Sequence, residues 1–270
     1  MIKQNPNPSP IEKMWFGLSC FGGVKVNRRD FLNKELFKYY PQSVIDKAIA
    51  STPANAGVKS EDINKIADEV VKAERNIVSG LSAALGVPGG LAMLATIPVD
   101  LGQYYGAMLR VMQKLLYLYG FPQIDMEERN SRLDSQTVNL LTLCLGVMYG
   151  VAGTNHALHV VAKMLAKGVE KKLLKAALTK GAIYPIVKKV AQWFAVSMTK
   201  EIFAKTVSKS IPVIGAVIGG GLTFVTFNPC CDRLRKSLEN TRLSNPGMVD
   251  PDESEDDDLG IIDVEVITKD

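Results

Sequence analysis

The sequence has few of the residues that build covalent or metal-dependent sites. It contains only four cysteines and two histidines in 270 residues. Four cysteines are too few for a disulfide-stabilised scaffold, and two histidines leave little material for a zinc site or for histidine-based catalysis. It also contains no Gly-Lys-Ser/Thr phosphate loop and no Gly-x-Ser-x-Gly nucleophile elbow. We therefore expect no cofactor, no metal and no catalytic residues. A hydrolase centred on Asp100 is the one enzymatic alternative.

Signals for export and for β structure are also weak. The first ten residues hold three prolines and two asparagines and lack the apolar core of a signal peptide, so we expect that the protein is not secreted. Hydrophobic residues make up 47% of the chain, which excludes disorder over its whole length. They recur mostly at three-to-four spacing. The prediction is an all-α, compact multi-helix bundle with an irregular segment over 1–24, a helical domain over 25–243 and a disordered acidic tail over 244–270.

Charge is divided unevenly along the chain. Residues 250–270 hold ten acids and one base, a net charge of −9, whereas the whole chain carries +4. The remaining 249 residues therefore carry +13, an asymmetry that suggests a polyanionic partner. The tail is either a solvated, disordered segment or a segment that shields the basic body or docks a partner.

Three long stretches carry no charge and are rich in glycine; they are residues 76–99, 136–162 and 210–231. The first is long enough to cross a bilayer, which takes about 20 residues, but Pro88-Gly89-Gly90 interrupts it, which favours a buried helical hairpin. The spacing Gly146-x-x-x-Gly150 allows two helices to approach closely, in a bilayer or in a tight core. The sequence does not decide whether any of these stretches spans a membrane.

A lysine-rich stretch lies between the second and third of them. Residues 163–209 hold eleven lysines and two acids, with apolar residues interleaved at helical spacing. A basic amphipathic helix is attracted to an anionic membrane surface, by about 1 kcal/mol per lysine, but the same pattern fits an ordinary solvated helix face. Nucleic acid is not expected as a partner, because arginine is sparse there and no recognition motif occurs. The candidate lipid-binding residues are Lys163, Lys167, Lys171, Lys172, Lys175, Lys180, Lys188 and Lys189.

Asp100 is the one charged residue between Asn76 and Leu109. It follows Pro98 just inside a predicted helix, where the helix dipole favours a carboxylate. The sharper hypothesis is a buried polar site that Asp100 forms with Gln103, Tyr104 or Arg110. His156 and His159 share a helix face, but no further ligand lies near them in the sequence, so no zinc site is predicted.

Several short motifs, taken in order, resemble the EcsC family of bacterial proteins. They are Asn27-Arg28-Arg29-Asp30-Phe31-Leu32, Ile63-Asn64-Lys65-Ile66-Ala67-Asp68, Val87-Pro88-Gly89-Gly90 with Ile97-Pro98-Val99-Asp100, Gln113-Lys114-Leu115-Leu116-Tyr117-Leu118-Tyr119-Gly120, and Ile211-Pro212-Val213-Ile214-Gly215-Ala216-Val217-Ile218-Gly219-Gly220. The resemblance covers most of residues 25–240, departs from the family at Phe224–Cys231 and leaves out the acidic tail. That family is named for a gene beside those of an ABC transporter and has no agreed activity. The resemblance therefore implies a bacterial, cytoplasmic, membrane-linked helical protein and supplies no catalytic residues.

Three hypotheses follow for the function. The first is a non-enzymatic module at the inner face of the cytoplasmic membrane, with anionic lipid as its partner and a transporter or other membrane protein as a further one. The second is a switchable, membrane-inserting or pore-forming effector that uses residues 76–99 and 210–231. The third is a hydrolase centred on Asp100. The sequence does not predict the oligomeric state.

Overall fold

The computed structural model describes residues 8–20, 22–84, 99–127, 132–197 and 221–248. Within these ranges the chain forms helices and no strand, which confirms the all-α prediction. The helices are α1 (Pro10–Ser19), α2 (Arg28–Leu36), α3 (Gln42–Ala50), α4 (Ser60–Ala84), α5 (Val99–Leu118), α6 (Ser135–Tyr149), α7 (Thr154–Ala166), α8 (Lys171–Thr179), α9 (Ile183–Ser197) and α11 (Gly221–Glu239).

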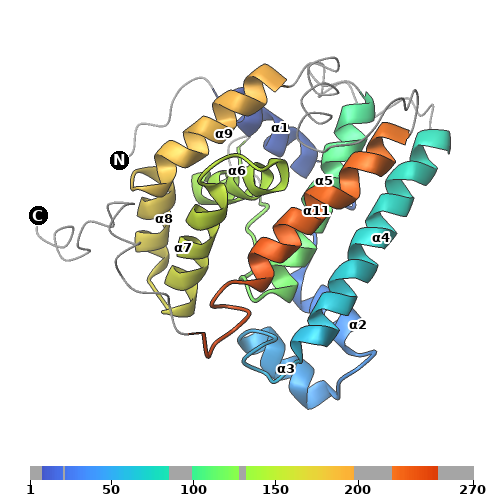
Figure 1. Ribbon diagram of the computed structural model, residues 1–270, viewed down its shortest axis with the longest axis vertical. Coiled ribbons are helices and arrows are strands. Elements are labelled where there is room, and N and C mark those ends of the chain that lie inside the picture. The colour runs from blue at the N-terminus through green and yellow to red at the C-terminus, as the bar shows by residue number, and fades with distance from the viewer. Residues whose placement is uncertain (1–7, 21, 85–98, 128–131, 198–220, 249–270) are drawn as a thin grey trace, which may run out of the picture.

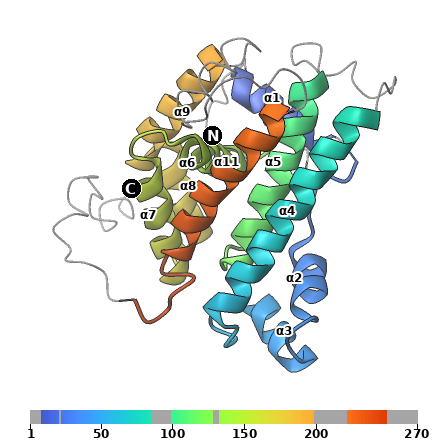
Figure 2. The same ribbon diagram turned by 45° about the vertical axis from the view of Figure 1, so that its right-hand side comes forward.

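Two groups of helices share one hydrophobic core. The helices α4 and α5 run antiparallel, and α11 lies along both of them (Figures 1 and 2). The second group consists of α7, α8 and α9, which pack around α6. Since α6 also packs against α11, it joins the two groups. The short helices α2 and α3 lie at one end of the α4–α5 pair, and α1 lies at the other end, against α5, α6 and α9.

The expectation of an irregular segment over residues 1–24 is wrong for residues 10–19, which form α1. Ser9 and Glu12 form a capping box, in which the backbone N–H of Glu12 donates to Ser9 Oγ over 3.4 Å and that of Ser9 donates to the Glu12 carboxylate over 2.6 Å. Trp15 is fully buried, and its ring N–H donates to Thr142 Oγ1 of α6 over 3.1 Å. The cap and this packing stabilise a helix that the nearby prolines obscured in the sequence.

Arg28 of α2 connects this helix to the end of α3 and to the segment after α5. Its side chain is buried, and its Nε donates to the carbonyl of Phe121, just after α5, over 3.0 Å. Its two terminal nitrogens donate to the carbonyls of Ala48, Ile49 and Ser51 over 3.2, 2.7 and 2.8 Å. These carbonyls lie at the C-terminal end of α3, where helical carbonyls have no intrahelical partners and a cation is favoured. Arg28 therefore replaces the missing hydrogen bonds there.

Glu74 holds α4 to α5. Its side chain is only 2% exposed, and its two carboxylate oxygens each lie 2.7 Å from a cation of α5, Arg110 Nε and Lys114 Nζ. A buried carboxylate is tolerated only when its charge and its hydrogen-bonding capacity are both met, and the two cations meet them here. The ion pair therefore fixes the register of the two helices.

The Gly146-x-x-x-Gly150 spacing serves the core of this bundle. A Cβ atom on Gly146 would lie 2.6 Å from the Cγ2 atoms of Thr154 and Val190, so α6 approaches α7 and α9 too closely for any side chain. Gly150 has φ of 70° and ends α6 in the left-handed conformation that glycine adopts without strain. In the part of the chain that the structure describes, no helix is both long enough and apolar enough to span a bilayer.

The uncharged stretches are only partly covered by the structure. α4 continues without a break to Ala84, and α5 begins at Val99, as the sequence predicts. The expected turn at Pro88-Gly89-Gly90 lies outside the described residues, as do residues 210–220 and the acidic tail from residue 249 onward. The stretch over 136–162 forms most of α6 and α7 and belongs to the core.

Candidate functional site

The eight candidate lysines lie on and between α7, α8 and α9. Residues 154–197 contain these eight lysines, no arginine and a single acid, Glu170. Lys163 and Lys175 are half-buried. The other six are exposed, and we call them the lysine face; they are Lys167, Lys171, Lys172, Lys180, Lys188 and Lys189.

The lysine face is positioned by the apolar side of α8 and α9. Leu174 and Leu178 of α8 are buried, as are Val187 and Val190 of α9. These residues recur at three-to-four spacing, so the positions between them turn outward. The amphipathic pattern that the sequence predicts is therefore present: apolar residues attach these helices to the core, and lysines cover their outer side.

Two of the eight lysines, Lys175 and Lys188, contact a described acid or aromatic ring. Lys175 Nζ lies 2.6 Å from Asp134 Oδ1, and Lys188 Nζ lies 4.9 Å from the centre of the Tyr184 ring. Burial alone would raise the pKa of Asp134, but hydrogen bonds from Lys175 and from the backbone outweigh burial and lower it. The six lysines of the lysine face have no acidic partner among the residues that the structure describes.

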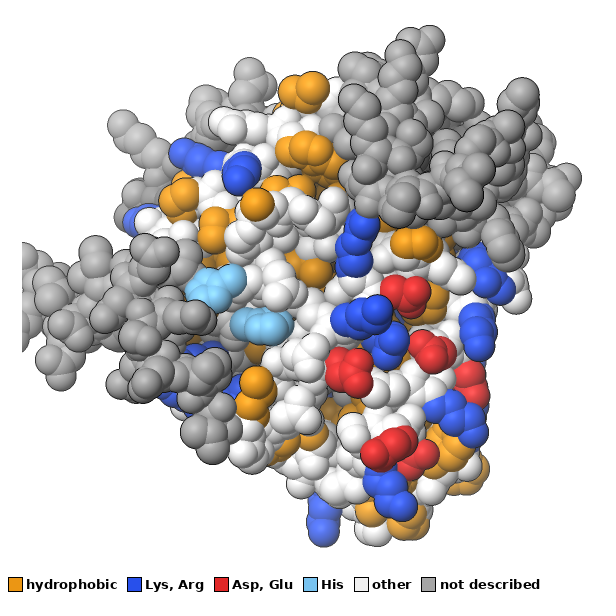
Figure 3. All heavy atoms as spheres, in the orientation of Figure 1, with side chains coloured by type: hydrophobic (Ala, Val, Ile, Leu, Met, Phe, Trp, Pro, Cys, Tyr) orange, Lys and Arg blue, Asp and Glu red, His pale blue; other side chains and the backbone are white. Residues whose placement is uncertain are grey.

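The opposite arrangement of charge is found over α4 and α11. Figure 3 shows acidic and basic side chains intermingled on this face. Arg235 of α11, for example, lies 3.4 Å from Asp68 of α4 and 3.4 Å from Glu239. Charges of both signs neutralise each other here, so this face attracts a polyanion less than the lysine face does.

The hypothesis of a polar site around Asp100 stays a prediction, because only two of its four side chains, Tyr104 and Arg110, are among the described ones. The side chains of Asp100 and Gln103 lie outside the part of the structure that is described. Arg110 pairs with Glu74, whereas the buried ring of Tyr104 packs edge-on against Phe227 of α11, with 5.9 Å between the ring centres. Tyr104 and Arg110 are six positions apart on α5, about 120° around the helix, and they face different neighbours.

A cluster of buried tyrosines and a thiol, which the sequence did not reveal, surrounds Tyr104. Tyr105 and Tyr149 are buried beside it, together with Cys230 of α11. Burial raises the pKa of both tyrosines and raises that of Cys230 to about 12. Tyr105, Tyr149 and Cys230 therefore stay protonated near neutral pH, and the Cys230 thiol is not a ready nucleophile.

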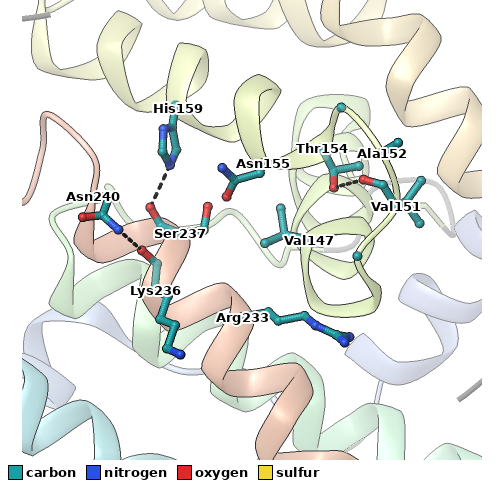
Figure 4. A pocket seen from close by; sticks show the side chains of 12 residues that line it. Val147, Val151, Ala152, Thr154, Asn155, His159, Arg233, Lys236, Ser237 and Asn240 are labelled. Atoms are coloured by element: carbon teal, nitrogen blue, oxygen red, sulfur yellow. Dashed lines mark hydrogen bonds between the residues drawn. The ribbon is translucent and has the colours of Figure 1, made fainter. Parts of the chain in front are cut away.

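A pocket of about 520 Å³ opens between the α6–α7 turn, the start of α7 and one side of α11 (Figure 4). We call it the α7–α11 pocket. Its lining includes His159, whose Nε2 lies 3.0 Å from the carbonyl oxygen of Ser237, and whose pKa is lowered by burial. In the parts of the chain with a described structure, no group of three metal-ligating side chains includes His156 or His159. This pocket could not be predicted from the sequence, because its walls come from two segments that are far apart in the chain, residues 147–159 and 233–240.

The chain was compared with family models, curated proteins and solved structures. No family model, no curated protein and no solved structure matches the chain. The resemblance to the EcsC family accordingly remains a prediction from the short motifs.

Proposed function

We propose that this protein is a non-enzymatic, peripheral module at the inner face of the cytoplasmic membrane, and that the lysine face binds anionic lipid. The observation that carries the proposal is the one-signed charge of residues 154–197, with eight lysines against one acid. An anionic membrane surface attracts each nearby lysine by about 1 kcal/mol, so several lysines acting together suffice for peripheral binding.

The build of the lysine face supports this proposal. Because the buried leucines and valines attach α8 and α9 to the core, binding at the outer side requires no rearrangement of the fold. The exposed side of α9 runs from Lys188 and Lys189 to Ala195 and Val196, and Val196 is 67% exposed. Cationic residues followed by exposed apolar ones are typical of helices that lie in a membrane interface. The motifs shared with the EcsC family also favour a membrane-linked role, with a transporter or other membrane protein as a further partner.

The proposal is tested by removing charge from the lysine face. We expect the fourfold variant Lys171→Gln, Lys172→Gln, Lys188→Gln and Lys189→Gln to lose up to about 4 kcal/mol of binding free energy to phosphatidylserine-containing vesicles. This corresponds to on the order of a thousandfold in affinity. The measurement is flotation of the full-length chain with vesicles of anionic or neutral lipid.

A matched control separates a local effect from the total charge. The variant Lys13→Gln, Lys47→Gln, Lys59→Gln and Lys72→Gln makes the same change in net charge at exposed lysines elsewhere on the molecule. Its binding should fall by less than tenfold. Equal losses in both variants would contradict the proposal, as would tighter binding to duplex DNA than to anionic vesicles. Binding that survives high salt and releases trapped dye would favour the membrane-inserting alternative instead.

A further inference from the structure

We propose that the α7–α11 pocket is a binding site for a phosphate group, either free in solution or on a lipid headgroup. This inference goes beyond the lysine face and does not depend on it. The pocket, of about 520 Å³, lies within the usual size range of small-molecule sites. Four features of its lining favour an anion: the sign of its charged side chains, an uncapped helix end, a buried hydroxyl and a histidine.

The charged side chains that line the pocket are cations. Arg233 and Lys236 of α11 contribute to the lining, and neither aspartate nor glutamate does. Arg233 Nη1 donates to the carbonyl of Met148 over 3.2 Å, which holds the guanidinium beside the α6–α7 turn. A Cβ atom on Gly150 would lie only 4.0 Å from the guanidinium carbon. The guanidinium therefore adds a positive charge at a fixed place on this side of the pocket.

The N-terminal end of α7 also borders the pocket. Its N-cap is Gly153, which has φ of 87°, and no side chain caps this helix. Within the described structure, the backbone N–H groups of Asn155 and His156 donate to no backbone acceptor. The N-terminus of a helix carries a partial positive charge and presents free N–H groups, which together favour an anion.

An independent sign of a ligand comes from Ser237. This residue is only 5% exposed, and its Oγ has no hydrogen-bond partner in the structure as described. Figure 4 shows the hydroxyl directed toward Asn155, across the space between α11 and the start of α7. Buried hydroxyl groups almost always have a partner. A phosphate oxygen in the pocket would accept its hydrogen bond.

His159 supplies a built-in reporter of occupancy. Because the carbonyl of Ser237 can only accept, Nε2 of His159 carries the proton, and Nδ1 is the site that gains one at lower pH. The charged and titratable groups around the ring are His156 on α7 and the lining cations Arg233 and Lys236 on α11. A phosphate group placed among them would favour the protonated ring and raise the pKa of His159.

The test follows the two histidine signals of the full-length chain by NMR. Inorganic phosphate is added in the absence of vesicles, with chloride keeping the ionic strength constant, and a His159→Gln variant assigns the signals. We expect a saturable shift of the His159 signal and a higher pKa for this residue. Ser237→Ala should weaken phosphate binding about tenfold, because it removes a hydrogen bond to the ligand. Lys236→Gln should weaken it by less, because it removes a nearby charge whose ammonium group is directed away from Ser237 (Figure 4). Lys72→Gln, at an exposed lysine of α4, should leave the affinity unchanged.

Thermal unfolding separates a binding role of Ser237 from a structural one. Since its hydroxyl has no partner among the described residues, Ser237→Ala should not lower the Tm. A lowered Tm with unchanged phosphate affinity would overturn the proposal.

A vesicle experiment distinguishes the two sources of phosphate. If lipid supplies the phosphate, Ser237→Ala will weaken binding to phosphatidic acid vesicles, which carry a terminal phosphate monoester, more than binding to phosphatidylserine vesicles, whose phosphate is a diester. If the phosphate comes from solution, Ser237→Ala will weaken the binding of inorganic phosphate and leave binding to both kinds of vesicle unchanged. The absence of any saturable response to either probe would also overturn the proposal. Because the phosphate titration contains no vesicles, it can fail or succeed independently of lipid binding by the lysine face.

Discussion

Residues 28–84 and residues 154–197 use charge in opposite ways. The first region holds nine basic and eight acidic residues, and the second holds eight lysines and one glutamate. In the first, Arg28 and Glu74 are buried and bonded to groups of other helices. In the second, most of the lysines lie at the surface. Charge therefore helps to hold helices together in the first region. In the second region packing holds them together, and the charge is left available to a partner.

The strongest test of this contrast is the replacement of Arg28 by methionine. This change leaves four carbonyl oxygens at the end of α3 and after α5 without their donor, and should cost about 4 kcal/mol of unfolding free energy. The measurement is urea unfolding followed by circular dichroism. Arg29→Met is the control at the exposed neighbouring position and should change stability by less than about 0.5 kcal/mol. Similar losses of unfolding free energy in the two variants would contradict the structural role of Arg28.

A somewhat smaller effect is expected at Glu74. Glu74→Gln leaves Arg110 and Lys114 facing a neutral group in a largely buried position, and should cost about 3 kcal/mol of unfolding free energy. On the same helix, Glu69 is half-exposed and lies 3.6 Å from Lys38, so Glu69→Gln should cost only about 0.5 kcal/mol. The ratio between these two costs, obtained from parallel denaturant curves, tests whether burial gives the Glu74 ion pair its importance.

In the second region a change in packing should matter more than a change in charge. Gly146→Ala inserts a methyl group where Thr154 and Val190 already occupy the space, and should cost about 2 kcal/mol in spite of alanine's higher helix propensity. Gly22→Ala places its methyl group in open space and should be close to neutral. A neutral Gly146→Ala, measured as an unchanged Tm, would show that α6, α7 and α9 are packed more loosely than described.

The smallest effect on stability is expected from the lysine face itself. The fourfold variant at Lys171, Lys172, Lys188 and Lys189 should alter unfolding free energy by less than about 0.5 kcal/mol, because these side chains are exposed and form no ion pair with the described acids. The same variant is expected to lose most of its binding to anionic vesicles. A loss of stability comparable to that of Glu74→Gln would contradict the division of roles between the two regions.

The fold could be predicted where local patterns determine it. The three-to-four spacing of apolar residues predicted helices, and Pro98 indicated the start of α5, which the structure places at Val99. The partners of Arg28 and Glu74 could not be predicted, since they lie between 20 and 93 residues away in the sequence. The helix α1 was missed because the prolines around it suggested irregular structure, although Ser9, Pro10 and Glu12 are a local signal for a helix start. The burial of Trp15 against α6 is a tertiary contact and has no local signature.

Of the candidate sites, too, only those that depend on a local sequence pattern could be predicted. The lysine face was visible in the sequence, because a run of lysines at helical spacing is a local pattern. The α7–α11 pocket was not, because Gly153, His159 and Ser237 are brought together only when α11 packs beside α7. The hypothesis around Asp100 rested on proximity along one helix, but Arg110 pairs with a residue of α4 instead.

The most direct test of the account is flotation of the wild-type, full-length chain with vesicles of increasing phosphatidylserine content, at low and at high salt. Binding through the lysine face predicts an affinity that rises steeply with the anionic lipid fraction and falls when salt is added, because salt screens exposed charges. Equal binding to neutral and anionic vesicles, or no binding to either, would contradict it.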